Sequence, residues 1–217
     1  MLMKIQILIS KNSWANNHKN YLKINLKKFS KDIKFLDNHK YLNRKYDVNI
    51  IFSYFQKIPK KYLKRSTRNI IPHESDLPKG KGMSPLTWQI LENKKEIFFS
   101  LIEAGEKIDA GLIYYKKKIK IKKNLIFPEI KKIQLVENVK LIKKFLEHYK
   151  DTNHFAHAKK QIGKPTFYKI RKPKDSQLNI NDTIKNQFNL LRVADPKNYP
   201  TFIKIFGKKF KISISYL

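Results

Sequence analysis

The sequence predicts an α/β fold with a mostly parallel central sheet flanked by helices. Short apolar segments alternate with segments of helical spacing along the first half of the chain, which is the pattern of βαβ units. A long amphipathic helix follows, and the tail carries a hairpin pattern. A chain of 217 residues suits one domain with a small appendage. We therefore expect a main domain at 1–150 and a C-terminal extension at 151–217, made of a connector, a short helix and a β-hairpin.

The individual elements follow from hydrophobic spacing. Short apolar segments predict strands, and segments with apolar residues three or four apart predict helices. Strands are expected at residues 4–9, 33–36, 48–53, 69–72, 96–103 and 113–121. Helices are expected at residues 15–29, 84–93, 129–150 and 183–191. Ser84 is the predicted N-cap of the second helix, because Pro85 suits the first helical position.

The helix at 129–150 has the clearest pattern. Its apolar residues form one stripe, made of Ile130, Ile133, Val136, Ile142, Phe145 and Tyr149. The lysines expected on its outward side are Lys131, Lys132, Lys140, Lys143 and Lys144. Near the C-terminus, the segments on either side of Gly207 predict a hairpin that turns at this glycine.

Composition excludes several kinds of protein and site. The chain has no cysteine, which rules out disulfides, zinc–thiolate sites and cysteine nucleophiles. The apolar run at its N-terminus is too short to cross a bilayer and lacks a cleavage site of small residues. We therefore expect a soluble, cytoplasmic protein without a membrane partner. We expect no metal site, because His154 and His157 lack a supporting carboxylate or cysteine framework.

The net charge of +31, from 48 Lys and Arg against 17 Asp and Glu, has two interpretations. A strongly basic chain suits a polyanionic partner such as RNA, or an acidic membrane surface. Alternatively, the lysines reflect codon bias, because they are scattered along the chain and accompany many Asn and Ile residues. We favour codon bias, and a phosphate-bearing substrate would benefit from the positive field in either case.

A loop rich in glycine and proline follows the strand predicted at 69–72 and begins with His73. Ligands of open α/β sheets bind beyond the carboxyl ends of the strands, where this histidine is expected. Gly80 and Gly82 allow close backbone approach, and the helix after Ser84 offers free N–H groups to an anion. Taken alone, a histidine in a loop is more often a structural hydrogen-bonding residue.

A second segment, EKIDAG at 106–111, contains Asp109 and would by itself favour a simple turn. Together, the two segments resemble the folate-dependent formyltransferases. The family's His-x-Ser-x-Leu-Pro loop is similar to HESDLPKGKG at 73–82, and its Asp-x-Gly segment is similar to IDAGLI at 108–113. The resemblance covers most of the chain, and HESDLPKGKG with SPLTWQIL at 84–91 looks closest to small sugar N-formyltransferases.

This resemblance implies a Rossmann-like formyltransferase fold, a catalytic domain at 1–150 and 10-formyltetrahydrofolate as the co-substrate. His73 would donate a hydrogen bond to the developing oxyanion, and Asp109 would take a proton from the attacking amine. The residues expected to bind the folate are Phe55, Gln56, Ile58, Gly105 and Ile108. The residues expected to bind the acceptor substrate are Ser13, Trp14, Lys79, Gly80 and Gly82.

The chain departs from the family pattern at one position. The family places Asn two residues before the histidine, where this chain has Ile71, while Asn69 lies four residues before it. Four residues of strand span about 13 Å, so Asn69 could reach the reaction centre only if the chain bulges near Pro72. Ser75 and the backbone N–H groups of the glycine loop are the other candidates for this donor.

The leading hypothesis is formyl transfer to the amine of a nucleotide-linked amino sugar, as in surface polysaccharide biosynthesis. A second hypothesis makes initiator methionyl-tRNA the acceptor. The charge favours it, but 151–217 is smaller than the RNA-binding domain of the tRNA enzymes. A third is a nucleic-acid-binding protein on a degenerate formyltransferase fold, against which the presence of His73 and Asp109 argues. The tail hairpin could also pair across a homodimer.

Overall fold

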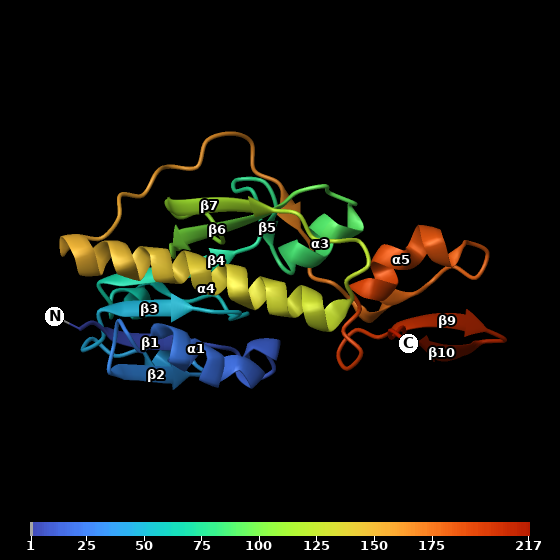
Figure 1. Ribbon diagram of the computed structural model, residues 1–217, viewed down its shortest axis with the longest axis horizontal. Helices are drawn as coiled ribbons and strands as arrows, with labels where there is room; N and C mark the ends of the chain where they lie inside the picture. The colour runs from blue at the N-terminus through green and yellow to red at the C-terminus, as the bar shows by residue number, and fades with distance from the viewer. Residues whose placement is uncertain (1) are drawn as a thin grey trace.

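The computed structural model describes residues 2–217 and shows a six-stranded sheet with helices on both faces (Figure 1). The sheet has the order β2-β1-β3-β4-β6-β7. Its strands are β1 (Lys4–Leu8), β2 (Asp32–Leu36), β3 (Val48–Ile51), β4 (Arg68–His73), β6 (Ile97–Glu103) and β7 (Ile113–Ile119). The pairs among β2, β1, β3 and β4 are parallel, whereas β6 runs antiparallel to both β4 and β7. The predicted α/β fold with a mostly parallel sheet is confirmed.

Burial along the strands explains their sequences. All four residues of β3 are buried, which suits a central parallel strand covered on both faces. At the edge of the sheet, β7 instead alternates exposed lysines with partly buried residues. Lysines at an edge strand hinder pairing with another chain, so Lys116 and Lys118 protect this edge.

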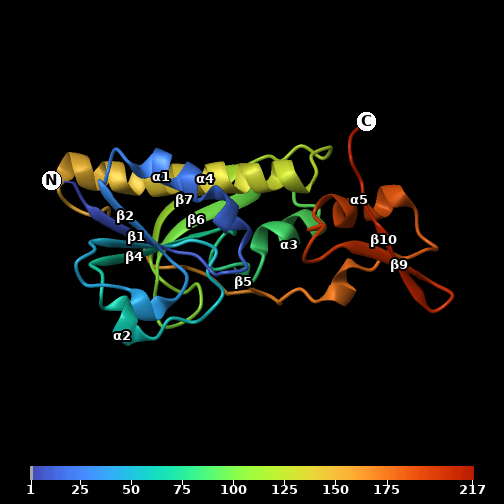
Figure 2. The ribbon, with the colours of Figure 1, turned by 90° about the horizontal axis from the view of Figure 1, so that it is seen from below.

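The helices are α1 (Lys19–Leu26), α2 (Lys60–Leu63), α3 (Pro85–Leu91), α4 (Phe127–Thr152) and α5 (Ile184–Arg192). Short 3-10 helices lie at Trp14–His18, His39–Tyr41 and Pro173–Ser176. Figure 2 shows α1 and α4 together on one face of the sheet and α2 on the other. The main hydrophobic core fills the space between the sheet, α1 and α4, and a smaller cluster lies beside α2. No helix among residues 2–217 is both long enough and apolar enough to span a bilayer.

The long helix α4 has clear start and stop signals. The Glu129 side chain accepts a hydrogen bond from the backbone N–H of Ile126, at 2.9 Å, and Pro128 lies in the first turn. At the other end, Asn153 adopts a left-handed conformation with φ 57°. Between these ends the predicted stripe is confirmed in part, because Ile130, Ile142 and Phe145 are buried whereas Ile133, Val136 and Tyr149 are only partly buried. The buried face also includes residues that the prediction left out, namely Leu135, Val139, Leu141 and Leu146.

Two small sheets complete the fold. The hairpin of β9 (Thr201–Ile205) and β10 (Lys208–Ile212) lies beyond α5, away from the central sheet (Figure 1). Phe206 and Gly207 form its turn with φ values of 48° and 76°, which confirms the turn predicted there. The connector contributes β8 (Phe167–Tyr168), which pairs in parallel with β5 (Lys81–Gly82).

The predicted N-cap at Ser84 is confirmed in position but lacks the capping hydrogen bond. Ser84 precedes α3 as expected, and Pro85 occupies the first helical position. However, Ser84 has φ 54° and ψ 44°, and its side chain makes no capping hydrogen bond. An N-cap side chain reaches the helix N–H groups from an extended backbone, so the left-handed conformation turns this hydroxyl away from them.

Gly82 lies where no side chain fits. Its φ is +100°, and an added Cβ would collide with the backbone carbonyl oxygen of Tyr168 in the neighbouring strand. Gly105 is the opposite case, because its φ is ordinary and an added Cβ would meet open space. These two glycines therefore form a matched pair for testing the contact between β5 and β8.

Phe145→Ala is expected to lower the free energy of unfolding by about 3–5 kcal/mol. Phe145 is fully buried in the main core and contacts the rings of Tyr114 and Phe155, with centroid distances of 4.7 and 5.5 Å. Chemical denaturation of the purified protein measures the change. Lys132→Ala on the exposed side of α4 is the control and should stay within about 0.5 kcal/mol of the wild type; equal effects would contradict the described core.

Gly82→Ala is expected to cost at least about 1–2 kcal/mol of stability, because alanine must adopt a positive φ and displace the Tyr168 backbone. The same measurement on Gly105→Ala should show a change within about 0.5 kcal/mol. Tolerance of alanine at position 82 would mean that β5 and β8 do not pair as described.

Candidate active site

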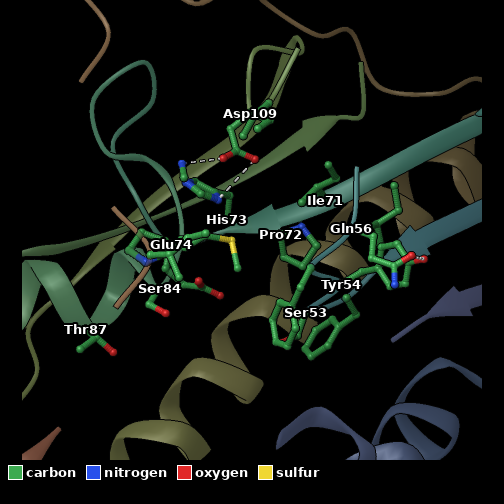
Figure 3. A pocket seen from close by; sticks show the side chains of 18 of the residues that line it. Ser53, Tyr54, Gln56, Ile71, Pro72, His73, Glu74, Ser84, Thr87 and Asp109 are labelled. Atoms are coloured by element: carbon green, nitrogen blue, oxygen red, sulfur yellow. Dashed lines mark hydrogen bonds and ion pairs between the residues drawn. The ribbon is translucent and has the colours of Figure 1, made fainter. Parts of the chain in front are cut away.

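Two residues from different loops face each other at the carboxyl end of β4. His73 is the last residue of β4, and Asp109 lies in the loop between β6 and β7. The Nδ1 atom of His73 is 3.7 Å from Oδ1 of Asp109, and the two side chains are 7% and 12% exposed. Figure 3 shows the two side chains pointing toward one another. The structure thus brings together the pair that the sequence motifs predict.

Backbone groups of the glycine loop hold both members of this pair. The Nε2 atom of His73 lies 3.0 Å from the carbonyl oxygen of Gly80. A carbonyl oxygen only accepts hydrogen bonds, so Nε2 carries the proton and Nδ1 faces Asp109. The N–H of Gly82 donates to Oδ2 of Asp109 at 2.8 Å. One short loop therefore orients the imidazole and the carboxylate at the same time.

Asp109 is fixed from a second direction. Its φ is 48°, a left-handed conformation that Asp tolerates better than most residues. The side-chain amide of Gln161, in the C-terminal connector, donates to the backbone oxygens of Asp109 and Gly111 at 2.8 and 2.9 Å. The connector therefore supports the loop that carries the carboxylate.

The pair opens into a cavity of about 830 Å³. Ile71, Pro72, His73 and Asp109 contribute to its wall. Figure 3 places Ser53, Tyr54 and Gln56 on one side of His73, and Glu74, Ser84 and Thr87 on the other. The cavity therefore has two ends with the His73–Asp109 pair between them, which is the layout that two substrates need in order to react.

The first end contains every residue expected at the folate. Residues 51–58 and 102–109 line it, including Phe55, Gln56, Ile58, Gly105 and Ile108. The Phe55 and Ile108 side chains are 51% and 61% exposed although both are apolar. Exposed apolar groups inside a cavity suit a flat, largely apolar ligand ring.

Only some of the residues expected at the acceptor line the cavity. Trp14 and Gly82 do, whereas Ser13, Lys79 and Gly80 do not. The Ser13 hydroxyl accepts from the N–H of Ala15 at 3.1 Å, which caps a 3-10 helix instead. Lys79 is exposed to solvent outside the cavity, and the backbone of Gly80 is used to hold His73.

Asn69 does not reach the cavity, which corrects the catalytic role considered for it. Its amide donates to the carbonyl oxygen of Leu63 at 2.9 Å, and its oxygen accepts from Asn49 at 3.0 Å. The register between β4 and β6 runs without a break past Pro72, so no bulge shortens the distance. Asn69 therefore ties β4 to β3 and to the end of α2.

Ser75 is also outside the cavity lining, which corrects its role as the substitute donor. Its side chain is 1% exposed, and its hydroxyl finds no hydrogen-bond partner among residues 2–217. Its carbonyl oxygen accepts from Ser100 on β6 at 2.7 Å, which fixes the loop to the sheet. Ser75 faces the protein interior, where no substrate can reach it.

The second end of the cavity contains polar residues that the sequence patterns did not single out. Lys131, Gln134 and Asn138 of α4 line it together with Glu74. Lys131 was expected to face away from the protein, but its Nζ lies 4.9 Å from the ring centroid of Trp14 and 2.8 Å from Oε1 of Gln134. Burial lowers the pKa of Lys131 to about 8, although the negative charge of Glu74 opposes this shift.

A sequence signal for this end existed in α4. Positions 131, 134 and 138 are three and four residues apart, so they share one helix face. That face borders the apolar stripe of α4, and Gln134 and Asn138 are only 7% and 2% exposed. Polar residues at a spacing that places them beside a buried stripe indicate a lined cavity rather than a solvated surface.

The charge of the cavity differs from that of the whole chain. The basic residues of its lining are Lys57, Lys107, Lys131 and Arg171. The acidic residues of its lining are Glu74, Glu103, Glu106, Asp109 and Asp195. The two signs nearly balance, so the excess positive charge of the chain lies outside the cavity. Among residues 2–217, no group of three or more His, Asp or Glu side chains could hold a metal ion.

Similar proteins share both the sequence pattern and this architecture. A methionyl-tRNA formyltransferase from Finegoldia magna is 28% identical over 170 residues, which are 76% of this chain and 53% of the relative. The chain thus spans about half the length of the curated relatives it matches.

Among solved structures, a methionyl-tRNA formyltransferase from Clostridium thermocellum has a TM-score of 0.81 at 22% identity, covering 100% of this chain and 94% of the other. A 4-N formyltransferase from Francisella tularensis has a TM-score of 0.71 at 20% identity, covering 98% and 97%. HypX from Aquifex aeolicus in complex with tetrahydrofolic acid has a TM-score of 0.76 at 17% identity, covering 99% and 38%. These likenesses show a shared fold.

The family assignment comes from the sequence itself. Residues 7–144 match the family model for formyl transferases, which is well over half of the chain. The matched region contains five of the six strands of the central sheet and the end of β1, together with His73, Asp109 and the part of α4 that lines the cavity. This chain belongs to the formyl transferase family.

Proposed function

We propose that this chain transfers a formyl group from 10-formyltetrahydrofolate to the amine of a nucleotide-linked amino sugar. The observation that carries the proposal is the His73–Asp109 pair, held 3.7 Å apart at the middle of a two-ended cavity. Family membership favours formyl transfer as the chemistry. The apolar end of the cavity suits the folate ring, and the polar end leaves room for a second substrate.

The residues of the apolar end fit a reduced folate. Phe55 and Ile108 offer exposed apolar surface to a flat ring, and the loops at 51–58 and 102–109 bring backbone groups to its edges. HypX, a neighbour with the same fold, is solved in complex with tetrahydrofolic acid. When bound, the folate supplies the activated formyl carbon that the amine attacks.

His73 and Asp109 have different roles in the proposed reaction. When the amine adds to the formyl carbon, negative charge develops on the formyl oxygen. Charged His73 carries its second proton on Nδ1, because Nε2 already donates to Gly80, and it can stabilise that oxygen. Asp109 keeps Oδ1 available to take the proton that the amine loses, because the N–H of Gly82 binds its other oxygen. The bond between the formyl carbon and the folate nitrogen then breaks, and this nitrogen takes up the proton that Asp109 accepted, so the products are the formylated amine and tetrahydrofolate.

The choice of acceptor rests on the polar end of the cavity. Trp14, Lys131 and Asn138 wall it on one side, and Arg171 and Tyr199 of the C-terminal extension also line it. Such a walled, polar space suits a small hydroxylated amine. A sugar N-formyltransferase from Shewanella sp. FDAARGOS_354 shares this fold over 97% of its own length, which supports an acceptor of that class.

Methionyl-tRNA is the second candidate acceptor. Several curated relatives with similar sequences are methionyl-tRNA formyltransferases. The excess positive charge outside the cavity would also suit the tRNA backbone. A direct comparison of the two acceptors therefore tests the proposal.

The purified chain is expected to release tetrahydrofolate from 10-formyltetrahydrofolate when given at least one nucleotide-linked 3- or 4-amino sugar. Absorbance of the released folate follows the reaction. Charged initiator tRNA is the competing acceptor in a parallel assay. Strong turnover on the tRNA with none on the sugars would replace the sugar proposal with the second candidate.

His73→Ala and Asp109→Asn should each lower kcat by about 10²–10³-fold, since one loses the oxyanion donor and the other the proton acceptor. Lys132→Ala, on the exposed side of α4, is the matched control and should retain wild-type turnover. Unchanged turnover in both site variants would refute the assignment of this pair.

A further inference from the structure

Glu74 is a buried carboxylate with one free oxygen at the cavity wall. It follows His73 directly, is 7% exposed and lines the polar end of the cavity. Its Oε1 accepts a hydrogen bond from the side-chain amide of Asn138 at 2.6 Å. No hydrogen bond from residues 2–217 reaches its Oε2, and this oxygen is not among the fully buried unpaired atoms, so it keeps contact with solvent. A buried carboxylate normally has more partners than this, so the free oxygen requires an explanation.

Neighbouring elements fix Glu74 in this position. The side-chain amide of Gln89 on α3 donates to the backbone oxygen of Glu74, while Asn138 on α4 holds the carboxylate. Two elements therefore restrain both its backbone and its side chain. Such restraint is typical of a group that must be ready for a ligand before the ligand arrives.

The hydrogen bond from Asn138 to Glu74 accompanies an unpaired oxygen on Asn138. Its side chain is 2% exposed, and its own Oδ1 is buried without a partner among the described residues. An unsatisfied buried oxygen is destabilising, and an apolar residue at this position would avoid it. The amide is needed only if the carboxylate beside it must stay charged and oriented. This arrangement indicates that Glu74 serves a ligand rather than the fold.

No cation neutralises Glu74 directly. In the part of the chain that the structure describes, no Lys, Arg or His nitrogen lies within 4.0 Å of its carboxylate. Lys131 influences it from a distance, but the Lys131 ammonium donates to Gln134 and lies over Trp14. The cavity lining thus presents an unpaired carboxylate and a separate ammonium to a group that carries both donors and acceptors.

We infer that Glu74, oriented by Asn138, determines acceptor specificity by accepting hydrogen bonds from the amine and hydroxyl groups of the acceptor substrate. This inference rests on the proposed formyl transfer and narrows its acceptor. Lys131, on the same face of α4 as Asn138, donates to acceptor oxygens. The preferred substrate is then a primary amine that carries neighbouring hydroxyl groups. The thioether side chain of a methionyl ester offers no donor to this carboxylate, so only the amine of such an acceptor would bind here.

The test is a kinetic comparison of Glu74→Gln with the wild type, using the best amino-sugar nucleotide from the acceptor panel. Glutamine keeps the shape but removes the charge, and hydrogen bonds to charged groups are about twice as strong as neutral ones. The KM for the acceptor should rise by about 10–100-fold. The KM for 10-formyltetrahydrofolate and kcat should both stay within about threefold.

Matched variants separate recognition from folding. Glu137→Gln, one residue before Asn138 on α4, removes a carboxylate that pairs with Lys117 and Lys140 outside the cavity, and it should leave both KM values unchanged. Asn138→Leu should raise the acceptor KM in the same direction as Glu74→Gln, but by less. Thermal melting identifies any variant that fails to fold. If Glu74→Gln fails to fold, Glu74→Asp, which keeps the charge, replaces it in the test and should raise the acceptor KM alone.

Calorimetric titration of tetrahydrofolate into the wild type and Glu74→Gln measures folate affinity, and it distinguishes a failure of this inference from a failure of the proposed function. Equal folate affinity in both proteins, with weaker acceptor binding in the variant, supports the inference. Turnover by the wild type combined with an unchanged acceptor KM in Glu74→Gln overturns the inference and leaves the proposed function standing. A fall in the kcat of Glu74→Gln that is equal whether the acceptor or 10-formyltetrahydrofolate is varied also overturns the inference. Absence of turnover with every amine overturns the proposed function, and this inference falls with it.

Discussion

Two backbone groups of the loop at 80–82 hold the His73–Asp109 pair, and the rest of the site is arranged around them. The Gly80 carbonyl oxygen accepts a hydrogen bond from Nε2 of His73, which fixes the position of the imidazole proton. The Gly82 N–H donates to the Asp109 carboxylate. Gly82 can occupy this place because it has no side chain to collide with Tyr168 in β8. The C-terminal connector therefore supports the reactive pair, although it lies outside the residues that match the family model. Loss of the contact between β5 and β8 would disturb the histidine and the carboxylate together.

Charge is distributed so that the surface and the cavity serve different purposes. The chain carries +31 overall, yet the cavity lining has four basic and five acidic residues. A polar, nearly balanced interior can bind a hydroxylated amine through directed hydrogen bonds, for which a strong field of one sign is unsuited. The scattered surface lysines can still attract an anionic substrate toward the opening. The two interpretations of the net charge given by the sequence therefore concern the surface, and the chemistry depends on individual residues inside the cavity.

Hydrophobic spacing and turn residues predicted the sheet, α4 and the hairpin turn at Gly207, because strand alternation, helix periodicity and turn chemistry depend on short stretches of chain. The meeting of His73 with Asp109 was instead implied by the resemblance of the two loop segments to the formyltransferases. The failures involve longer-range constraints. The position of Asn69 depends on the unbroken register between β4 and β6, and the direction of Lys131 depends on the cavity beside α4. Glu74 was part of a recognised motif, but its free oxygen and the amide of Asn138 become visible only when the loop and the helix are placed together.

In the proposed function, one cavity holds the formyl donor at its apolar end, with the reacting carbon beside the His73–Asp109 pair. A crystal structure of this protein with a non-transferable formyl-folate analogue is the sharpest test. We expect the pterin ring to pack against Phe55 and Ile108, the formyl oxygen to lie within hydrogen-bond distance of His73, and the end beside Glu74 to remain open. A folate bound at the Glu74 end, or with its formyl group remote from both His73 and Asp109, would refute this arrangement.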